Sequence, residues 1–408
     1  MSDVRLLLFD DRGARGWAPF TLTRPAGELL YGTLTLRERA ERVFGVACEG
    51  HVSRSALRGF DEPDAAPTVA MEDIGTEGTR VLLSSRAAPK LGPVSIPDHP
   101  ARLIVDGEAA GWILPPGVDV PSELWLRDPD AAPTELGEAL VLHGDMLGHP
   151  WDLVRRNPEC IREDVAALWG EADDAPDVTR IGGGVVSLGE GAEIETGVYV
   201  DTRSGPVRLD RGVRVEGPAR LIGPLFVGAG SRILGGHVGA SSIGPVCVVR
   251  GEVADSVMLG YVNKAHDGYI GHALLGRWVN LGAYTTNSDL KNNYRPVRVW
   301  TPEGDVDTGL LKVGCFLGDH VKTGIGTVLN TGTVIGAGTN VFGGLMPPSV
   351  VPPFSWGLGP DLRDHKLDKF LSAAARAMAR RDQELTAGVR RILEEAWGAT
   401  AGRRAQGT

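Results

Sequence analysis

The sequence is poor in cysteine, in basic charge and in long apolar runs, and each deficit excludes a class of protein. Its four cysteines are widely scattered and form no CxxC pair, so neither a zinc ribbon nor a disulfide framework is expected. Reduced thiols are the rule in the cytoplasm, which is the compartment that we expect. The chain has 42 Lys and Arg against 52 Asp and Glu, a net charge of −10, whereas a nucleic-acid-binding surface would be basic.

The apolar runs are too short for a membrane segment. The N-terminal run at 6–9 is shorter than the apolar core of a signal peptide. No later segment reaches the roughly 18 apolar residues of a membrane-spanning helix. We therefore expect a soluble protein with no membrane partner. Glycine, in contrast, is abundant at 56 residues, and an excess without a collagen period indicates a fold made of tight turns.

A six-residue repeat runs through the second half of the chain. From residue 207 the sequence divides into VRLDRG, VRVEGP, ARLIGP, LFVGAG and SRILGG, with an aliphatic third place at Leu209, Val215, Leu221, Val227 and Ile233. The period returns downstream, where hexads begin with Leu317, Leu329, Ile335 and Val341. Such a period fits short strands joined by tight corners, with one aliphatic side chain pointing inward. It predicts a parallel β-helix over 181–354. The alternative, a glycine-rich β-sandwich, has no fixed period.

The rest of the chain has other patterns. In residues 1–148, strand-like segments at 4–11, 101–107, 110–115 and 139–145 alternate with a helix-like segment at 32–45. This predicts an α/β domain whose ligands bind at the carboxyl ends of the strands. We interpret 149–180 as a linker plus helix and 355–408 as a helical tail that caps the solenoid. In the tail, one helix face collects Leu367, Phe370, Leu371, Ala374 and Met378.

The segment that interrupts the repeats carries the most specific motif. HDGYIGHALLGRWVNLGAYT at 266–285 has the form H-x-x-Y-x-G followed by V-N-[IL]-G-A-x-T. It resembles the acetyltransferase segment of the bifunctional GlmU family, and NKAHDG and SDLKNNY resemble a divergent GlmU-like branch. The order of α/β domain, hexapeptide repeats and helical tail is similar to that family over nearly the whole chain. The resemblance implies an α/β nucleotidyltransferase-like domain, a left-handed parallel β-helix with a terminal α-helix, and a homotrimer.

GlmU enzymes acetylate glucosamine 1-phosphate and then uridylylate the product to UDP-N-acetylglucosamine. The resemblance therefore implies an enzyme whose substrates are a sugar phosphate, acetyl-CoA and a nucleoside triphosphate, with Mg²⁺ as cofactor. Two alternatives stay open. The front domain could be a degenerate nucleotide-sugar-binding module beside an active acetyltransferase, or the β-helix could be a non-catalytic scaffold.

The family's acetyltransferase residues carry over one by one. His266 corresponds to the catalytic histidine, Tyr269 and Asn280 to sugar-phosphate contacts, and Ala283 to a position near the acetyl-CoA thioester. Lys264 is close to a family lysine but one place out of register.

The family's next Asn-Tyr pair falls on Asp289 and Leu290, which do not match. Asn292, Asn293 and Tyr294 are the candidates to replace it.

These residue types suit acyl transfer on chemical grounds alone, independently of the resemblance to the GlmU family. A histidine titrates near the working pH and can act as the base, with a solvated loop histidine as the alternative reading of His266. Corner N–H groups of a β-helix are rigid donors for an oxyanion. A sugar phosphate needs cations, for which Lys264, Lys291 and Arg295 are candidates. The repeat lapses between 286 and 310, and in GlmU-like trimers a loop of this kind walls the active site.

A zinc enzyme is a second reading from another class. His237, His266, His272 and His320 could be ligands, as in a γ-class carbonic anhydrase, which is also a trimeric β-helix. Zinc needs ligands that converge on one point. His266 and His272 are six residues apart, which places them on successive sides of the solenoid, pointing apart.

The front half departs from the family pattern. A GlmU-type uridylyltransferase opens with a loop of the form G-x-G-T-R-M and a Pro-Lys pair, but here the place is taken by LFDDRGARGWAPFTLTRP. Asp11 ends the first strand, and Arg12 and Arg24 are the expected phosphate-binding cations, with Arg15 as a competitor. Asp145 in LHGDM resembles a magnesium-binding aspartate of these transferases.

Overall fold

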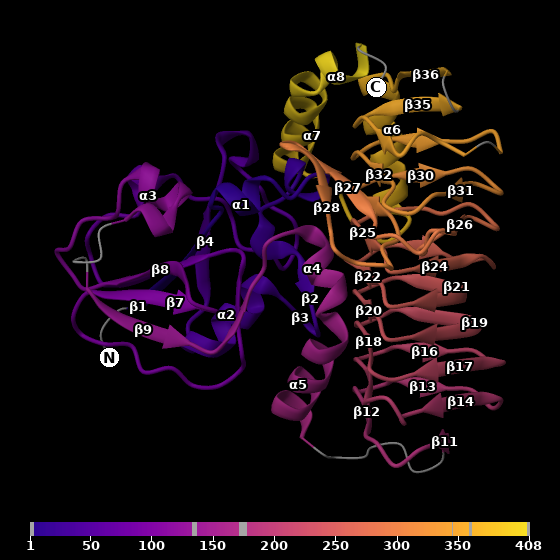
Figure 1. Cartoon of the computed structure of the whole chain (residues 1–408), viewed down its shortest axis with the longest axis horizontal. Coiled ribbons are helices and arrows are strands. Elements are labelled where there is room, and N and C mark those ends of the chain that lie inside the picture. Colours follow the sequence, from indigo (N-terminus) through magenta and orange to yellow (C-terminus); the bar gives the residue numbers. More distant parts are fainter. Residues whose placement is uncertain (1–3, 133–136, 171–177, 345, 359–360, 406–408) are drawn as a thin grey trace.

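The computed structural model describes residues 4–132, 137–170, 178–344, 346–358 and 361–405. It consists of a front α/β domain, a β-solenoid and terminal helices (Figure 1). The front domain lies along one side of the solenoid. Helices α4 (Pro150–Arg155) and α5 (Asn157–Trp169) run between the two. Part of the expected linker, 171–177, lies outside the described residues.

The front domain is built on a mixed six-stranded sheet of order β4-β1-β5-β8-β7-β9. Its strands are β1 (Val4–Phe9), β4 (Cys48–Val52), β5 (Thr79–Ser84), β7 (Ala101–Val105), β8 (Glu108–Leu114) and β9 (Glu138–Leu142). Smaller pairs are β2 (Leu30–Tyr31) with β3 (Leu34–Thr35) and β6 (Ala87–Pro89) with β10 (Gly144–Met146). Strand β1 pairs in parallel with both β4 and β5, so their carboxyl ends share one edge.

Helix α2 (Leu36–Phe44) confirms the helix predicted at 32–45. Thr35 and Glu38 form a capping box at its start, and Gly45 ends it with φ at 67°. Glycine suits that left-handed position because it has no Cβ. The predicted strands around 4–11, 101–107, 110–115 and 139–145 are present as β1, β7, β8 and β9.

One side of the solenoid is a nine-stranded parallel sheet. Its strands are β12 (Val186–Leu188), β15 (Val207–Leu209), β18 (Leu225–Val227), β20 (Ser242–Ile243), β22 (Val257–Met258), β25 (Leu274–Leu275), β29 (Phe316–Leu317), β32 (Val334–Ile335) and β34 (Val350–Val351). The residues predicted to point inward lie in one core, and Leu209, Val215, Leu221, Val227 and Ile233 are each at most 1% exposed. The parallel β-helix prediction is therefore confirmed.

The strands of the other two sides are likewise stacked coil upon coil. They are β11 (Thr179–Ile181), β13 (Glu193–Ile194), β14 (Val198–Asp201), β16 (Arg214–Val215), β17 (Ala219–Ile222), β19 (Arg232–Gly239), β21 (Val248–Ala254), β23 (Asn263–Lys264), β24 (Tyr269–Gly271), β26 (Thr286–Asn287), β30 (Lys322–Thr323), β31 (Val328–Leu329) and β33 (Asn340–Val341). β35 (Ser355–Leu358) pairs with β33 and forms a hairpin with β36 (Asp361–Asp364), so strand pairing extends into the expected tail.

The nine-stranded side is covered by the front domain. Successive residues of a strand point to opposite faces, so inward Leu275 and Leu317 alternate with outward Leu274 and Phe316. The outward residues pack with Trp17, Phe20 and Trp151 of the front half. The two halves thus share a hydrophobic core.

The described part of the tail has three helices, α6 (Leu367–Ala379), α7 (Ala387–Ala399) and α8 (Ala401–Ala405), rather than the one predicted. The predicted apolar face of α6 is buried at Phe370, Leu371, Ala374 and Met378. It packs on the solenoid residues Trp278 and Phe354. Ile392 of α7 instead packs with Leu57 and Phe60 of the front domain, so the tail joins both halves.

The excursion forms a hairpin of β27 (Arg298–Thr301) and β28 (Gly304–Asp307). Val297 and Val299 are buried in the core shared with the front domain. Glu303 at the hairpin turn pairs with Arg12 at 3.0 Å.

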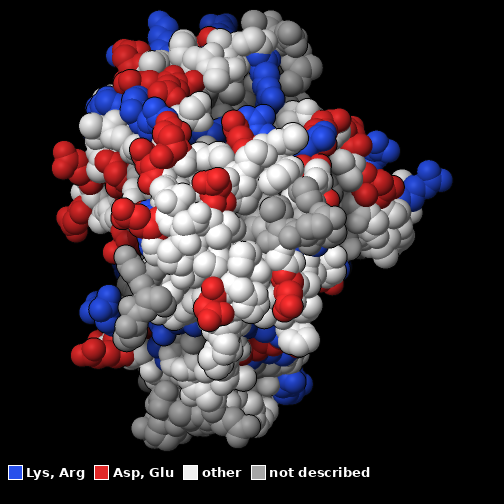
Figure 2. Space-filling model, turned by 90° about the vertical axis from the view of Figure 1, so that its left-hand side faces the viewer, with Lys and Arg blue, Asp and Glu red and all other residues white. Residues whose placement is uncertain are grey.

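The far face of the front domain shows scattered acidic and basic side chains around a largely uncharged centre (Figure 2). Among the described helices, none is long and apolar enough to cross a membrane.

Candidate functional site

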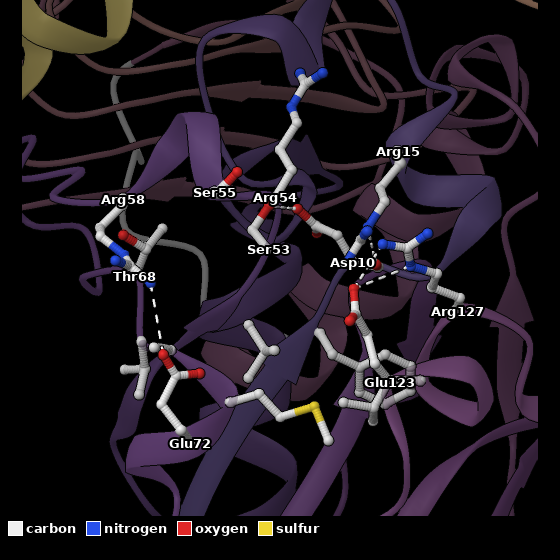
Figure 3. Close-up of a pocket in the computed structure, with 16 residues that line it drawn as sticks. Asp10, Arg15, Ser53, Arg54, Ser55, Arg58, Thr68, Glu72, Glu123 and Arg127 are labelled. Atoms are coloured by element: carbon white, nitrogen blue, oxygen red, sulfur yellow. Dashed lines mark hydrogen bonds and ion pairs between the residues drawn. The ribbon is translucent and has the colours of Figure 1, made fainter.

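Four arginines line a cavity at the carboxyl ends of β1 and β4, where ligands bind in open α/β sheets. The cavity encloses about 270 Å³, and its arginines are Arg15, Arg54, Arg58 and Arg127 (Figure 3). We call it the arginine cavity. Arg15 ends the short helix α1 (Arg12–Arg15), Arg54 and Arg58 come from the loop after β4, and Arg127 ends α3 (Glu123–Arg127).

Two of these arginines have exposed acidic partners. Arg127 pairs with Glu123 at 2.6 Å, and Arg58 lies 3.7 Å from Glu72. All of these side chains are more than half exposed. Water screens such pairs strongly, so they hold the arginines only weakly.

Arg15 and Arg54 have no carboxylate partner within the described part of the chain. Arg15 Nε donates to the backbone carbonyl of Asp10 at 2.8 Å. Burial lowers the pKa of both arginines, more than the Asp10 charge nearby raises it. A bound anion would compensate this cost, because guanidinium groups form strong paired hydrogen bonds with phosphate oxygens.

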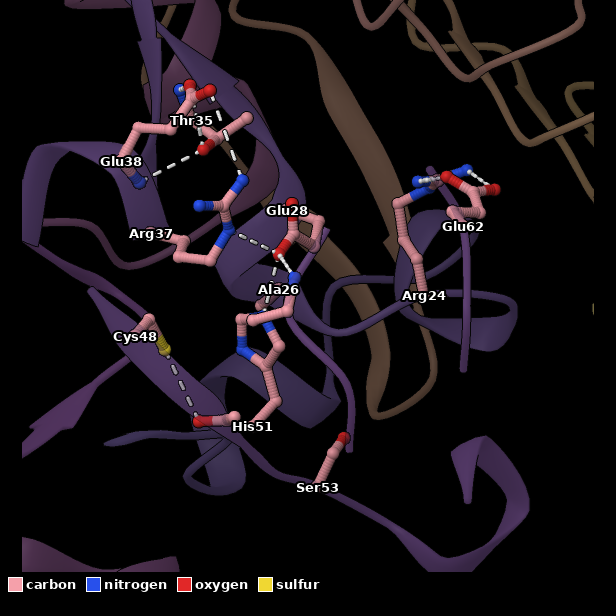
Figure 4. A network of polar contacts seen from close by, with 12 residues as sticks. Arg24, Ala26, Glu28, Thr35, Arg37, Glu38, Cys48, His51, Ser53 and Glu62 are labelled. Carbon is pink, nitrogen blue, oxygen red and sulfur yellow. Dashed lines mark hydrogen bonds and ion pairs between the residues drawn. The ribbon is translucent and has the colours of Figure 1, made fainter. Parts of the chain in front are cut away.

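Buried polar contacts fix the loops behind the cavity. The Asp10 carboxylate accepts a hydrogen bond from Ala26 N at 3.2 Å and another from the Ser53 hydroxyl. Beside them, Glu28 accepts from Arg37 at 2.7 Å and contacts His51 at 2.8 Å (Figure 4). Burial raises the pKa of Glu28, but His51 and Arg37 outweigh it and lower the pKa below its usual value.

Arg15 and Arg54 also line a larger neighbouring cavity of about 520 Å³. We call it the interdomain cavity, because Pro352 of the solenoid and Arg403 of the tail line it as well. Trp300 of the hairpin forms part of its wall, with its ring 5.4 Å from the Arg403 guanidinium. The two cavities therefore meet at the same pair of arginines.

Of the residues predicted to bind nucleotide, only the competitor Arg15 lines the arginine cavity, and Asp11, Arg12 and Arg24 lie outside it. Asp11 is buried, accepts from Ala14 N at 2.8 Å as the cap of α1, and pairs with Arg86 at 2.8 Å. Arg12 is exposed and pairs with Glu303. Both line another cavity of about 300 Å³, which shares Arg127 with the arginine cavity.

The predicted phosphate-binding role of Arg24 is the prediction that the structure contradicts most clearly. It is 1% exposed, and its guanidinium binds Glu62 and Asp319, each at 2.8 Å. Arg277 of the solenoid also reaches Glu62, at 2.9 Å. The positive charge of Arg24 is thus neutralised by buried carboxylates where the front domain meets the solenoid. Arg24 is therefore not available to bind a nucleotide.

Asp145 is likewise occupied. It accepts from the Tyr31 hydroxyl at 2.6 Å and forms an ion pair with Arg156. Within the described residues, no three His, Cys, Asp or Glu side chains are arranged to hold a metal ion. The geometry therefore favours Asp145 as a structural residue rather than a magnesium ligand, and the zinc reading gains no support.

In the solenoid, His266 is exposed at a corner between β23 and β24. No hydrogen bond of its ring is found among the described residues. Lys264 is 2% exposed, and its ammonium donates to the carbonyls of Arg250 at 2.7 Å and His266 at 2.5 Å. Burial lowers the pKa of Lys264 to about 8. The Lys264 ammonium therefore stabilises the corner by binding two backbone carbonyls rather than a phosphate. This corrects its predicted role.

Asn280 and Ala283 lie on the next coils beside His266. Asn263 donates to Asn280 Oδ1 at 2.9 Å, and Lys322 follows Asn280 in the same ladder. Ala283 forms a corner whose carbonyl accepts from Gly326 N at 2.8 Å. This side is open in the single chain, so a ligand here would need a second wall.

Tyr269 binds Asp289 rather than His266. Its hydroxyl donates to Asp289 Oδ2 at 2.7 Å, at the opposite end of the same solenoid side. Burial, then the Asp289 contact, raises the pKa of Tyr269. No contact between the motif residues His266 and Tyr269 is found among the described residues, and their joint role in one site stays a prediction.

The excursion residues do not join the His266 corner either. Lys291 donates to the Pro296 carbonyl at 2.9 Å, and Asn292, Asn293 and Tyr294 are exposed. The hairpin that follows contacts the front domain of the same chain. The expectation that this loop walls an acetyl-transfer site in a trimer stays a prediction.

Comparison with known proteins agrees with the two-part fold. A family model described as sugar nucleotidyl transferase matches residues 6–172. A bifunctional sugar-1-phosphate nucleotidylyltransferase/acetyltransferase of Sulfurisphaera tokodaii is 27% identical over 198 residues, which is 48% of this chain and 44% of that protein. Bifunctional GlmU of Methanococcus maripaludis is 27% identical over 225 residues, or 53% of this chain and 49% of that protein. Bifunctional GlmU of Acaryochloris marina is 28% identical over 182 residues, covering 39% and 36%.

The chain is thus similar to divergent GlmU-like proteins, and its front part, residues 6–172, matches the sugar nucleotidyl transferase model. The matches span about half the length of these relatives or less.

Several residues of this GlmU-like chain were missed by sequence reasoning. Arg54, Arg58 and Arg127 follow no fingerprint, since they come from the loop after β4 and from the end of α3, which meet only in the fold. Lys322 could have been found, because it occupies the hexad place next to Asn280. It is largely buried and its pKa is lowered by burial.

Proposed function

We propose that this GlmU-like protein is a transferase of nucleotide-sugar synthesis with two separate sites. The arginine cavity binds a nucleoside triphosphate for nucleotidyl transfer to a sugar 1-phosphate. The His266 corner carries acetyl transfer from acetyl-CoA to an amino-sugar phosphate. UDP-N-acetylglucosamine or a related nucleotide sugar would be the product. We expect the protein in the cytoplasm, where these substrates are found.

The observation that carries the proposal is the pair Arg15 and Arg54, which are partly buried and have no carboxylate partner among the described residues of a nucleotidyltransferase-like domain. In this reaction an oxygen of the sugar phosphate attacks the α-phosphorus of the nucleotide, and the bond to pyrophosphate breaks. Charge builds on the phosphate oxygens, and fixed guanidinium groups stabilise it. The interdomain cavity, which shares both arginines, offers room for the sugar.

Mg²⁺ enters this proposal only with the triphosphate. The described residues form no dedicated cluster of metal ligands, and magnesium is commonly held largely by substrate phosphates.

For acetyl transfer, the amine nitrogen attacks the thioester carbonyl and the C–S bond breaks. His266 takes the proton from nitrogen and returns it to the leaving thiolate. Lys322, beside Asn280, is positioned to meet the sugar phosphate.

A second copy of the chain would supply the missing wall. Tyr284, Ile325 and Phe342 stand on the same row of corners as His266 and are 65%, 75% and 36% exposed. Exposed apolar groups in a row are typical of subunit contacts. We therefore propose a homotrimer, and light scattering that shows a stable monomer at micromolar concentration would contradict it.

The decisive experiment separates the two sites. Calorimetric titration with UTP and dTTP in Mg²⁺ should show binding that Arg54→Ala weakens about 10- to 100-fold, the loss expected for one charged hydrogen-bonding group. Arg42→Ala on the exposed face of α2 is the matched control. If neither nucleotide binds and no pyrophosphate forms with any sugar phosphate, the front domain is a degenerate module.

Acetyl transfer has its own variant. His266→Ala should lower thiol release with the best amino-sugar phosphate by about 10²- to 10⁴-fold, as for loss of a general base. Unchanged thiol release would remove His266 from the mechanism. No release by the wild type with any acceptor would favour the scaffold alternative.

A further inference from the structure

The interdomain cavity differs from the arginine cavity in the charge of its wall. Its cations are Arg15, Arg54 and Arg403, and no Asp or Glu lines it among the described residues. The wall of the arginine cavity, in contrast, also includes the carboxylates of Glu72 and Glu123. Three cations without an acid are unexpected in a chain whose net charge is −10. The electrostatic potential inside the interdomain cavity therefore favours a negatively charged ligand.

Arg403 is the cation that the tail contributes to this wall. Its side chain is exposed, and within the described part of the chain its guanidinium has no carboxylate partner. It lies 5.4 Å from the centre of the Trp300 ring. The next residue, Arg404, is used differently, because it pairs with Asp364 at 3.1 Å. Of these two adjacent arginines, Arg403 thus keeps its charge available to a ligand.

Trp300 supplies an aromatic face to the same cavity. It belongs to β27 of the hairpin, which lies beside the tail helices on the side of the solenoid that faces the front domain (Figure 1). Buried Val297 and Val299 fix the hairpin in the core shared with the front domain. An indole offers a large, rigid apolar surface, and small-molecule sites commonly combine such surfaces with a few polar groups. The cavity therefore has a surface for a ring as well as cations for an anion.

The arrangement of the two cavities fits a reaction between two phosphorylated substrates. Both cavities are lined by Arg15 and Arg54. A nucleotide in the arginine cavity and a sugar phosphate in the interdomain cavity would thus meet at the same two guanidinium groups. Holding two reactants in contact in this way is a large part of catalysis in transfer reactions.

We propose that the interdomain cavity is the acceptor subsite of nucleotidyl transfer, and that Trp300 and Arg403 complete it from outside the nucleotidyltransferase-like domain. The subsite selects sugar 1-phosphates whose ring carries an acidic or uncharged substituent over those with a free amine. This inference rests on the nucleotidyl transfer proposed above. Trp300 contacts the sugar ring, and Arg403 attracts a carboxylate and repels an ammonium group. An oxygen of the 1-phosphate attacks the α-phosphorus of the nucleotide, and pyrophosphate leaves.

The first test ranks three acceptors by calorimetry on the full-length protein. They are glucuronic acid 1-phosphate, glucose 1-phosphate and glucosamine 1-phosphate, each alone and with a UTP analogue whose α–β bridge cannot be cleaved. At about pH 6.5 the sugar amine is protonated. We expect the affinity to fall in the order given, by about tenfold from first to last, as for a change of charge near fixed cations. Equal affinities, the reverse order or no binding in either condition would overturn the inference.

Nucleotide binding and pyrophosphate formation separate this inference from the proposed function. If UTP binds and pyrophosphate forms while the acceptors bind in another order, the inference fails and the proposed function stands. If UTP does not bind and no pyrophosphate forms, the proposed function is refuted, and the inference is refuted with it.

Arg403→Gln locates the selection, because glutamine keeps much of the length of the side chain and removes its charge. We expect the tenfold range of affinities to shrink to about threefold or less, while the affinity for UTP and the free energy of unfolding stay unchanged. Arg390→Gln is the matched control, since Arg390 is an exposed arginine of α7 outside the cavity. An unchanged range in Arg403→Gln would overturn the role of Arg403.

Trp300 is tested with two variants and two probes. Trp300→Leu should weaken the binding of glucose 1-phosphate about 2- to 10-fold, the usual contribution of an aromatic contact, and leave the binding of inorganic phosphate unchanged. In turnover, the KM for the sugar phosphate should rise more than kcat falls. Trp300→Phe keeps an aromatic ring and should retain most of the affinity. Equal losses for both probes would mean that Trp300 only supports the fold. If Trp300→Leu does not fold, Trp300→Phe and the exposed Arg403 variant still decide the inference.

Discussion

Two rows of outward-facing apolar residues on the same solenoid differ in their exposure to solvent. Leu274 and Phe316 lie under the front domain and are 0% and 2% exposed. Ile325 and Tyr284, on the row of His266, are 75% and 65% exposed. The repeat therefore determines which side chains point inward. Segments outside the repeat determine whether an outer side is covered or exposed. One side has become a domain joint, and the other remains open to ligands or subunits.

The largest change should come from breaking the ion cluster in the covered joint. Arg24→Ala would leave Glu62 and Asp319 buried with less positive charge, which typically costs about 3–5 kcal/mol. Chemical denaturation should show this loss of unfolding free energy. Arg12→Ala, which breaks only the exposed pair with Glu303, should cost less than about 1 kcal/mol. Equal effects of the two variants would refute the structural role of Arg24.

An apolar deletion tests the same joint without charge. Leu274→Ala should destabilise the protein by about 2–5 kcal/mol, because the surrounding halves cannot fully close the space. Val328→Ala, on a side chain that is 39% exposed, should change the unfolding free energy by about 0.5 kcal/mol or less. Similar thermal shifts for both would mean that the front domain does not cover the solenoid in solution.

Acid should loosen the joint as well. Burial raises the pKa of Glu62, but Arg24 and Arg277 outweigh it and lower the pKa from its usual 4.5 to about 2. Because the pKa of Glu62 is lower in the folded state, its ionised carboxylate adds up to about 3 kcal/mol to the free energy of unfolding above pH 4.5. This stabilisation is lost as the pH falls toward 2. Denaturation midpoints should therefore fall across this window. In Glu62→Gln that part of the pH dependence should be absent.

The smallest effect on the fold is expected on the open row. Ile325→Ser should leave the unfolding free energy within about 0.5 kcal/mol of the wild type, yet reduce the mass seen by light scattering if this row is the subunit contact. An unchanged oligomer would move the contact to another side.

The sequence could predict what depends on local pattern. Leu209 and Ile335 point inward because every sixth residue must fill the solenoid interior, and Gly45 ends α2 because only a left-handed residue fits there. Arg24 could not be placed this way. Its partner Asp319 lies 295 residues further along the chain, and a cation that binds phosphate looks the same in sequence as one that binds a buried carboxylate.

The shared core also constrains how the chain is made. Trp17 and Phe20 leave the ribosome early, but Phe316 and Val334, against which they pack, follow some three hundred residues later. At 5–20 residues per second, the front domain waits about 15–60 s for these coils. During that time its solenoid-facing apolar surface is exposed to solvent. Of the two arginines that bind Glu62, only Arg24 has then been synthesised. A nascent chain of this design therefore has a long interval in which chaperone binding competes with self-association.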